Sequence, residues 1–580
     1  MEFFSINVSK RHFKWIDALV LLFIFTILYS ILNLGASMNA PLELSNSGEI
    51  MLDPLMLPYY AGRSLLRMFI AFGISLIFAL IYGYAAAKSR TAEKICIPLL
   101  DMLQSIPVLG FLSATITAFI ALFPGSLLGV ELASILAIFT GQAWNMAFSF
   151  YNSLKTIPKD LQEASAVLRM NCWQRFLKLE VPFAMISLVW NSMMSFGGGW
   201  FFLAASEAIS VLGQDIRLPG VGSYLATAIE AGNMQAIGYS IITMVVMIIL
   251  VDQIFWRPLV VWSQKFKMEL TPSADTSTSF VYDILYRSTL VSILNNILFA
   301  PIWKVIHLLM DTLASFSEKT LQEFQKVPKL FSLGKLVRIF LMAVILKYMY
   351  GPALEAFRLV YSMDSSILLE IIQLGLYTFG RVMAAVLLGA LWTVPAGVWI
   401  GLNPRLAKVL QPVIQIMASF PANMLFPFIT ILFLKYQVNF EWGSIALMML
   451  GTQWYILFNV IAGTLSIPND LHEAGAIFKL QGWHKWKSII LPGIFPFLIT
   501  GIITASGGAW NASIVSEIVS WHDKELAATG LGAYISKVTE QGDWGGIIWG
   551  ITVMCLLVVI INRLLWRRLY QLAETKYHLD

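Results

Sequence analysis

Two polar stretches carry the same pattern of residue types, and their spacing indicates helix capping. Residues 157–163 read IPKDLQE and residues 467–473 read IPNDLHE, so in each a glutamate follows an aspartate by three positions. An aspartate before a helix accepts hydrogen bonds from its first free N–H groups, and a glutamate three residues later reaches back to the cap. The spacing therefore predicts short helices capped by Asp160 and Asp470.

An apolar face is expected beyond each cap. The residues that recur there at helical spacing are Leu161, Ala164 and Leu168 in the first stretch and Leu471, Ala474 and Phe478 in the second. Each stretch is thus expected to present a short, rigid, half-apolar knob to water. The same cap, Trp and Pro occur twice in register, which argues against ordinary loop helices.

The rest of the chain has the composition of a membrane protein. The chain is 58% hydrophobic and 13% charged, whereas soluble domains are about 25% charged. Long apolar runs follow one another, so we expect an all-α polytopic membrane protein with about 12 transmembrane helices. The predicted spans are 15–35, 63–87, 97–122, 129–150, 183–209, 236–260, 336–361, 370–401, 408–434, 443–465, 490–515 and 545–566.

Lysine and arginine residues gather on one side of these spans. They precede the first span, follow the second, fill the loop after the fourth and lie in the C-terminal tail. Residues 37–60, in contrast, contain three acidic residues and no Lys or Arg. By the positive-inside rule, both termini and both knobs are expected to be cytoplasmic.

The chain also repeats itself. The pairs at an offset of 310 residues (473 − 163 = 310) are Glu163 and Glu473, Gly197-Gly198 and Gly507-Gly508, Trp200 and Trp510, and Glu207 and Glu517, while Arg67 and Arg381 match at 314 (381 − 67 = 314). Each copy has an even number of predicted spans, so the sequence predicts two parallel six-helix repeats. Such a pair can enclose a path between its halves.

The repeats set the expected domain boundaries. The first copy is predicted over residues 1–262, with its knob in a loop of about 151–182, and the second over 336–580, with its loop at about 466–492. The joint, 263–335, begins with the linker-like TPSADTSTSF. Its segment 288–310 is apolar but interrupted by Asn, Pro, Lys and His, so we expect amphipathic helices on the cytoplasmic membrane surface.

Each loop, from Glu-Ala to the closing hydrophobic-Pro, resembles the EAA loop of binding-protein-dependent ATP-binding-cassette permeases. In that family the loop is the coupling helix that docks in a cleft of the ATPase subunit. The resemblance implies two fused type I permease copies in a bacterial inner membrane, served by two ATPase copies and a periplasmic or lipoprotein solute-binding protein. The residues it assigns to ATPase coupling are Asp160, Glu163, Ala164, Arg169, Asp470, Glu473, Ala474 and Lys479.

Within that family, the Ser-x-Pro turns at 105–107 and 419–421 and the Gly-Gly-x-Trp and Ser-Glu pairs are most similar to the nitrate, sulfonate/taurine and bicarbonate branch. That likeness implies a small anion as solute. One departure concerns the usual loop Gly six residues after the Glu, which is Arg169 in one copy and Lys479 in the other. A Gly permits positive φ, whereas a long cation does so at a cost, so we expect unusual docking geometry or partner charge.

ATP binding by this chain is not expected. No G-x-x-x-x-G-K-[ST] occurs, and Gly334-Lys335 lacks both the upstream Gly and the following hydroxyl residue. The three cysteines have no metal or redox spacing. The chain is therefore expected to be a transport component rather than an enzyme, without a cofactor, metal or nucleic-acid partner of its own, and ATP and Mg are expected on the separate ATPase.

The translocation path is expected to involve the fifth and eleventh spans. The candidate residues are Gly197, Gly198, Trp200 and Glu207, their matches Gly507, Gly508, Trp510 and Glu517, and the arginines Arg67 and Arg381. The glycines also fit plain helix packing, and the arginines also fit anchoring at the membrane edge. The alternative function is a secondary transporter or channel that works without an ATPase, and an exporter is a lesser alternative. Buried charged pairs at mid-membrane would favour the secondary transporter, and the sequence shows none.

Overall fold

A computed structural model gives the fold of the chain. It describes residues 15–38, 50–105, 108–211, 214–266, 279–294, 296–297, 300–312, 343–344, 347, 350–351, 354, 358, 365–521 and 524–576. The predicted span 336–361 falls almost wholly outside these residues. The described chain is almost entirely helical, as expected for an all-α membrane protein.

The first copy begins with α1 (Trp15–Ser37) and ends with a helix interrupted by a π-helical segment. In order, its remaining elements are η1 (Pro54–Met56), α2 (Leu57–Lys88), α3 (Arg90–Ser105), η2 (Val108–Phe111), α4 (Leu112–Leu122), α5 (Leu128–Lys155), α6 (Lys159–Val167), α7 (Cys172–Arg175), η3 (Phe176–Glu180), α8 (Val181–Glu207), β1 (Ala208–Val211), β2 (Gln214–Arg217), α9 (Val221–Glu230), α10 (Met234–Val251), η4 (Asp252–Trp256), α11 (Arg257–Ser263) and η5 (Gln264–Phe266).

The second copy repeats this order from α2 onward. Its elements are α16 (Ser365–Gly401), α17 (Pro404–Ser419), η7 (Ala422–Leu425), α18 (Phe426–Tyr436), α19 (Phe440–Leu465), α20 (Asn469–Ile477), α21 (Gly482–Lys485), η8 (Trp486–Ile490), α22 (Leu491–Ser516), β3 (Ile518–Trp521), β4 (Lys524–Ala527), α23 (Leu531–Gln541), α24 (Trp544–Ile561), η9 (Asn562–Trp566) and α25 (Arg567–Lys576).

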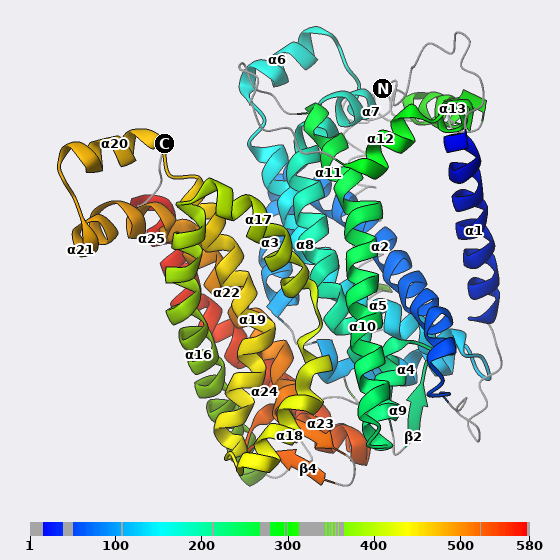
Figure 1. Cartoon of the computed structure of the whole chain (residues 1–580), viewed down its shortest axis with the longest axis vertical. Coiled ribbons are helices and arrows are strands. Elements are labelled where there is room, and N and C mark those ends of the chain that lie inside the picture. Colours follow the sequence, from blue (N-terminus) through cyan, green and yellow to red (C-terminus); the bar gives the residue numbers. More distant parts are fainter. Residues whose placement is uncertain are drawn as a thin grey trace.

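Seven helices in the described ranges are long and apolar enough to cross a membrane: 54–88, 172–207, 234–266, 366–401, 440–465, 482–516 and 544–573. The two copies stand side by side in Figure 1, with α6 and α20 at one end and β2, β4, α9 and α23 at the other. The predicted knobs therefore point the same way, as parallel repeats require.

The third predicted span of each copy is not one straight helix, which corrects that part of the prediction. In the second copy, the segments 409–419 and 422–436 meet at an angle of 79°. Phe420 is extended, with φ −71° and ψ 128°, because a residue before proline avoids the helical region and Pro421 has no N–H to continue the helix. In the first copy the corresponding elements are α3, η2 and α4.

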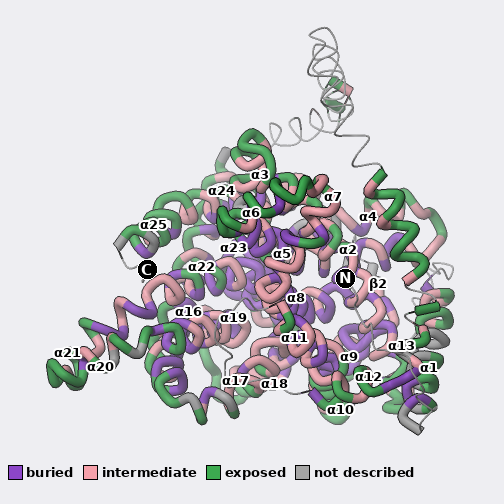
Figure 2. The backbone as a smooth tube through the Cα atoms, turned by 90° about the horizontal axis from the view of Figure 1, so that it is seen from above, coloured by how far each residue is buried: buried purple, intermediate pink, exposed green. Residues whose placement is uncertain are grey.

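These broken helices join the copies. α17 packs against α8 and α10 of the first copy, and in exchange α3 and η2 pack against α24, with η2 also touching α22 and α23. The backbone N–H of Val108 in η2 donates to Oδ1 of Asn511 in α22 at 3.0 Å. Figure 2 shows buried residues gathered in the middle of the molecule, around α5, α8 and α23.

The joint contains short helices, and their position on the cytoplasmic membrane surface stays a prediction. They are α12 (Phe280–Arg287), α13 (Thr289–Leu294) and a helical segment at 300–312. The buried carboxylate of Asp17 in α1 accepts hydrogen bonds from the hydroxyls of Ser288 and Thr289 and from the N–H of Leu290. Asp17 thereby caps α13 and ties the joint to the first span.

Candidate functional site

The two polar loops fold alike, but their helices are not capped as predicted. α6 begins at Lys159 and α20 at Asn469, one residue earlier than expected, with Pro158 and Pro468 as N-caps and no side-chain cap hydrogen bond. Asp160 and Asp470 are therefore second helical residues. A proline cap also has no N–H for a glutamate to reach back to, so the predicted capping box is wrong; the aspartates still place negative charge at the positive helix end.

Arg169 and Lys479, the cations that replace the usual loop glycine, lie just beyond the C-terminal ends of α6 and α20. Arg169 and Lys479 adopt the left-handed conformation, with φ of 49° and 50°. The next N–H closes the helix in each case: Met170 donates to the carbonyl of Ser165 at 3.1 Å and Leu480 to that of Gly475 at 2.8 Å. This is the glycine-type Schellman ending built with a cation, so the predicted cost is present as backbone strain.

Each loop carries an exposed apolar pair just before its cation. The exposed fractions are 81% for Val167, 66% for Leu168, 78% for Ile477 and 76% for Phe478. The predicted face is only partly exposed, because Leu161 packs against the core of the first copy. Glu163, Glu473 and Ala164 are exposed and Ala474 is half-buried, so these predicted coupling residues lie on or beside the same surface.

The bases of the two loops differ. In the first, Glu180 is buried and pairs with Lys88 and with Nε of Arg175, the latter at 3.0 Å. The matching residue in the second is Ile490 (180 + 310 = 490), which is 2% exposed in an apolar cluster. One loop is thus held by buried charge and the other by apolar packing.

The first loop also receives a contact from the joint. The carboxylate of Asp311 accepts from the side-chain amides of Asn171 at 2.6 Å and Gln174 at 3.1 Å. The hydrogen bond from Asn171 lowers the pKa of Asp311 below its ordinary value. Nothing in the repeat pattern of the sequence points to this contact, because the joint belongs to neither copy.

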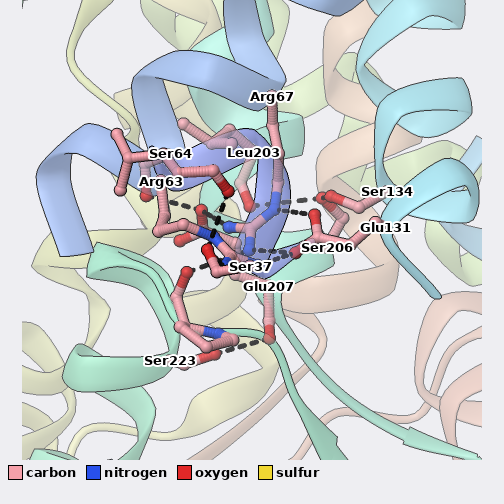
Figure 3. Close-up of polar contacts among 12 residues, drawn as sticks. Ser37, Arg63, Ser64, Arg67, Glu131, Ser134, Leu203, Ser206, Glu207 and Ser223 are labelled. Atoms are coloured by element: carbon pink, nitrogen blue, oxygen red, sulfur yellow. Dashed lines mark hydrogen bonds and ion pairs between the residues drawn. The ribbon is translucent and has the colours of Figure 1, made fainter. Parts of the chain in front are cut away.

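A second site lies at the opposite end of the spans, where Arg67 and Glu207 meet (Figure 3). Nη1 of Arg67 contacts Oε1 of Glu207 at 2.6 Å, and its Nε and Nη2 contact Glu131 at 2.5 and 2.9 Å. Arg63 pairs with the same Glu131, and all four side chains are fully buried. We call this group, from α2, α5 and α8, the first clamp.

Glu207 also holds the start of α9. Its Oε2 accepts from the N–H of Gly222 at 2.7 Å, while Ser64 accepts from Val221 at 3.1 Å. A Cβ at Gly220 would lie 2.3 Å from the Glu207 carboxyl carbon, and one at Gly222 would lie 2.5 Å from the carbonyl of Ala204. Glycine is required at both positions, because only a bare backbone lets the helix start approach the carboxylate.

The second clamp has the same plan with one cation fewer. Nη1 of Arg381 contacts Glu517 at 3.0 Å, and its Nη2 pairs with Glu441. Glu517 accepts from the N–H of Gly532 at 2.8 Å, as Glu207 does from Gly222. The position that matches Arg63 is Tyr377 (63 + 314 = 377), so the second clamp lacks this cation. The Glu441 side chain is 40% exposed. Two carboxylates therefore share one arginine.

The clamps revise the predicted roles of four residues. Arg67 and Glu207 were expected near the outer end of the spans, and the structure brings them together as a buried ion pair. Arg67 is therefore neither a membrane-edge anchor nor a free anion site. Arg381 and Glu517 pair in the same way. Sequence reasoning missed Arg63, Glu131 and Glu441. A signal was available for two of them, since Glu131 and Glu441 match at the repeat offset of 310.

Two of the four predicted glycines, Gly197 and Gly198, lie between the copies. A Cβ at Gly197 would lie 2.7 Å from the hydroxyl of Ser419, and one at Gly198 would lie 3.3 Å from that of Tyr455, both in the second copy. Gly508 faces Tyr455 and Thr452 of its own copy, whereas Gly507 faces open space among the described residues. Close approach of helices explains Gly197 and Gly198, and the same residues line hollows.

The predicted tryptophans are both buried, each 1% exposed. Trp200 packs edge-on against Phe196 and lines a hollow between the copies. Trp510 stacks on Phe379 within the second copy, with ring centroids 6.5 Å apart. The two matching positions thus have different surroundings.

Comparison with known proteins identifies the architecture. A family model described as "Binding-protein-dependent transport system inner membrane component" matches residues 71–255 and 393–576. The chain is similar to the nitrate import permease protein NrtB of Leptolyngbya laminosa (23% identical; 32% of this chain and 62% of that protein), to the bicarbonate transport system permease protein CmpB of Synechocystis sp. (26%; 32% and 64%), and to the taurine transport system permease protein TauC of Escherichia coli (25%; 33% and 66%). It spans less than two thirds of the length of these relatives.

Proposed function

Because the chain belongs to the family of inner membrane components of binding-protein-dependent transport systems, and contains its domain twice, we propose that it forms the complete membrane path of an ATP-driven importer. Each copy contributes one half of the path, and the two loops couple it to separate ATPase subunits. The observation that carries this proposal is the repetition of the loop fold, including its left-handed cation, on the same end of both copies.

The exposed loop tips supply the docking surface. Leu168 and Phe478 follow the ends of α6 and α20, next to Arg169 and Lys479. Burying a large apolar side chain gains about 1.5–3 kcal/mol, so seating each tip in a cleft is favourable, and the adjacent cation selects a cleft with an acidic rim. The glutamates Glu163 and Glu473 lie on the same exposed helices and face the ATPase.

Two loops imply two ATPase subunits on one copy of this chain. We place the loops and both termini in the cytoplasm, and the clamps at the outer face, where a solute-binding protein would deliver its cargo. The solute is proposed to be a small polar molecule. The names of the relatives leave its charge open, because they cover nitrate, bicarbonate, taurine and, for ProW of Escherichia coli, glycine betaine and proline betaine.

The secondary-transporter alternative gains no support from the buried ion pairs. Glu207 is the last residue of α8 and Glu131 the fourth of α5, so the first clamp lies at span ends rather than at mid-membrane. Its carboxylates are also occupied by arginines and backbone N–H groups, which leaves no carboxylate oxygen free to carry protons or ions along the path.

Reconstitution tests the proposal. The purified chain alone should hydrolyse no ATP, and with its cognate ATPase it should form a complex of one chain and two ATPase copies by native mass spectrometry. Solute uptake driven by an ion gradient in vesicles that contain only this chain would overturn it.

A further inference from the structure

Residues 300–312 form a helix within the joint, which we call the joint helix, and its two sides differ in polarity. The polar residues Lys304, His307 and Asp311 recur along one side at helical spacing. The apolar residues on the opposite side recur at i, i+3, i+4 and i+7, and Leu308 flanks them; together they are Ile302, Val305, Ile306, Leu308 and Leu309. The joint helix is therefore amphipathic.

The polar side of the joint helix faces the first loop. Asp311 accepts hydrogen bonds from the side-chain amides of Asn171 and Gln174, and Nδ1 of His307 lies 4.0 Å from the same carboxylate. The apolar side lies opposite, and the exposed fractions of its residues run from 40% for Ile306 to 70% for Leu308. A contiguous exposed apolar surface of this kind marks contact with a partner protein or with lipid.

The start of α13 gives the level of the joint relative to the spans. Asp17, which caps α13, lies in the first turn of α1. Among the described side chains of α1, exposed large apolar residues begin at Leu21, four residues or about 6 Å further along the helix. The headgroup layer on each side of the hydrocarbon core is about 5–8 Å thick. The joint therefore leaves α1 at the depth of that layer.

Two tyrosines of α12 are typical of the same depth. The rings of Tyr282 and Tyr286 stack with centroids 6.0 Å apart, and Nζ of Lys265 lies 5.6 Å from each centroid. Tyr and Lys gather at membrane–water interfaces, because their apolar parts stay among lipids while their polar ends reach water. In Figure 1, α12 and α13 lie at the end of the molecule that carries α6 and α7. These features favour lipid over a soluble partner as the cover of the apolar side.

We propose that the apolar side of the joint helix lies in the cytoplasmic leaflet, at the boundary of headgroups and acyl chains, and that this contact holds the first loop in place through Asp311. An amphipathic helix at the interface buries its apolar side to a depth of about 5–10 Å. The joint occurs once in the chain and belongs to neither repeat, so the bilayer supports the two loops unequally. The proposal uses the membrane orientation given above but not the coupling to an ATPase.

Spin labels on the full-length chain, in nanodiscs of phosphatidylcholine and phosphatidylglycerol without an ATPase, test the placement. The three native cysteines are replaced by serine, and a nitroxide is attached through Val305→Cys or Leu309→Cys. Both labels should collide more often with oxygen, which dissolves in lipid, than with a water-soluble nickel chelate, as measured by power saturation. The lipid control is a label through Leu22→Cys in α1, and the water control is one through Val167→Cys at the tip of the first loop.

Two results would overturn the placement. If the labels at positions 305 and 309 collide with the nickel chelate as often as the label at 167, the apolar side lies in water. If both labels are shielded from oxygen and chelate alike, a protein surface covers this side, either a second copy of the chain or another of its segments.

Two double variants test the link to the first loop. Val305→Glu with Leu309→Glu places charge on the apolar side and should raise hydrogen exchange at residues 171–175 about fivefold, the rise expected when a hydrogen-bonded contact is lost. Val305→Ile with Leu309→Met keeps the side apolar and should leave exchange within about twofold of wild type. Exchange at residues 481–485 should not change in either variant. Wild-type exchange at 171–175 in the glutamate variant, or an equal rise in both loops, would overturn the link. None of these measurements involves an ATPase, so failure of the coupling proposal would be seen separately.

Discussion

Arg67 and Glu207 form a fully buried ion pair, 2.6 Å apart, that joins α2 to the end of α8 and, through Glu207, to the first turn of α9. The matching pair in the second copy, Arg381 and Glu517, is 3.0 Å apart and lies beside the partly exposed Glu441. In the first clamp two arginines thus balance two carboxylates, whereas in the second clamp one arginine faces two carboxylates.

Removing the clamp arginine should destabilise either copy. Arg67→Met leaves Glu131 and Glu207 buried, with Arg63 as the one remaining cation, and breaking such a pair costs about 3–5 kcal/mol. Arg381→Met likewise leaves the buried Glu517 without its arginine, whereas water can solvate Glu441. Thermal unfolding of the two variants in the same detergent measures both losses, and wild-type stability of either variant would contradict the assignment.

A methyl group at the clamp glycine should also destabilise the protein. Gly222→Ala places a Cβ 2.5 Å from the carbonyl of Ala204, and overpacking of this kind costs about 1–3 kcal/mol. Gly238 in α10 is a matched control, since no atom lies within 4 Å of its Cβ position and alanine favours a helix. Unfolding temperatures should fall for Gly222→Ala and hold or rise for Gly238→Ala.

The left-handed cations allow conformation and charge to be separated. Arg169→Gly should relieve backbone strain of about 1 kcal/mol and slow hydrogen exchange at the end of α6, while Arg169→Ala should not. Both variants lose the charge, so ATPase affinity should fall in both if the cation contacts an acidic cleft. Lys479→Gly and Lys479→Ala repeat the comparison, and wild-type affinity in all four would exclude a role for the charge.

The joint should protect only the first loop. Asp311→Ala removes hydrogen bonds to Asn171 and Gln174, so exchange at residues 171–175 should rise roughly fivefold for a contact worth about 1 kcal/mol. Residues 481–485 of the second loop are the internal control and should not change. Similar increases in both loops would mean that the effect is global rather than local.

The same contact has a defined pH dependence. The pKa of Asp311 is lowered in the folded protein, so the ionised carboxylate favours the contact. Its stabilising effect is complete above the ordinary carboxyl pKa of about 4 and declines as the pH falls through the lowered value. Protection of the first loop should thus be constant from neutral pH to about pH 5, and loss of protection at pH 6 would contradict the contact.

The large features of the fold could be predicted because they depend on residue spacing and on the distribution of charge along the sequence. The apolar runs, the offset of 310 residues and the cation distribution give the helices, the duplication and the shared direction of the loops. Pro158 shows the limit: its position before Asp160 suggested a capped start, but the helix begins one residue earlier, with proline itself as the cap. Local helix boundaries depend on dihedral angles that spacing does not fix.

The charge clusters were harder to predict because they depend on tertiary contact. Arg67 and Glu207 are 140 residues apart in sequence and meet only when α2 packs against α8. Arg63 has no counterpart in the second copy, and Asp311 lies outside both, so comparison of the repeats could not find either. The hollows likewise depend on how the bent α17 packs against α8, which the sequence indicates only through the Ser-Phe-Pro turn.

Both loops are proposed to couple the path to ATPase subunits, and the double variant Glu163→Ala with Glu473→Ala tests this coupling. Both glutamates are exposed and neither belongs to a helix cap, so the variant should insert and fold as wild type does. The measurement is co-purification of the ATPase with the full-length chain at equal expression. We expect a strong loss of ATPase in the double variant and smaller losses in the single ones; wild-type recovery in the double variant would mean that these loops do not couple the path to the ATPase.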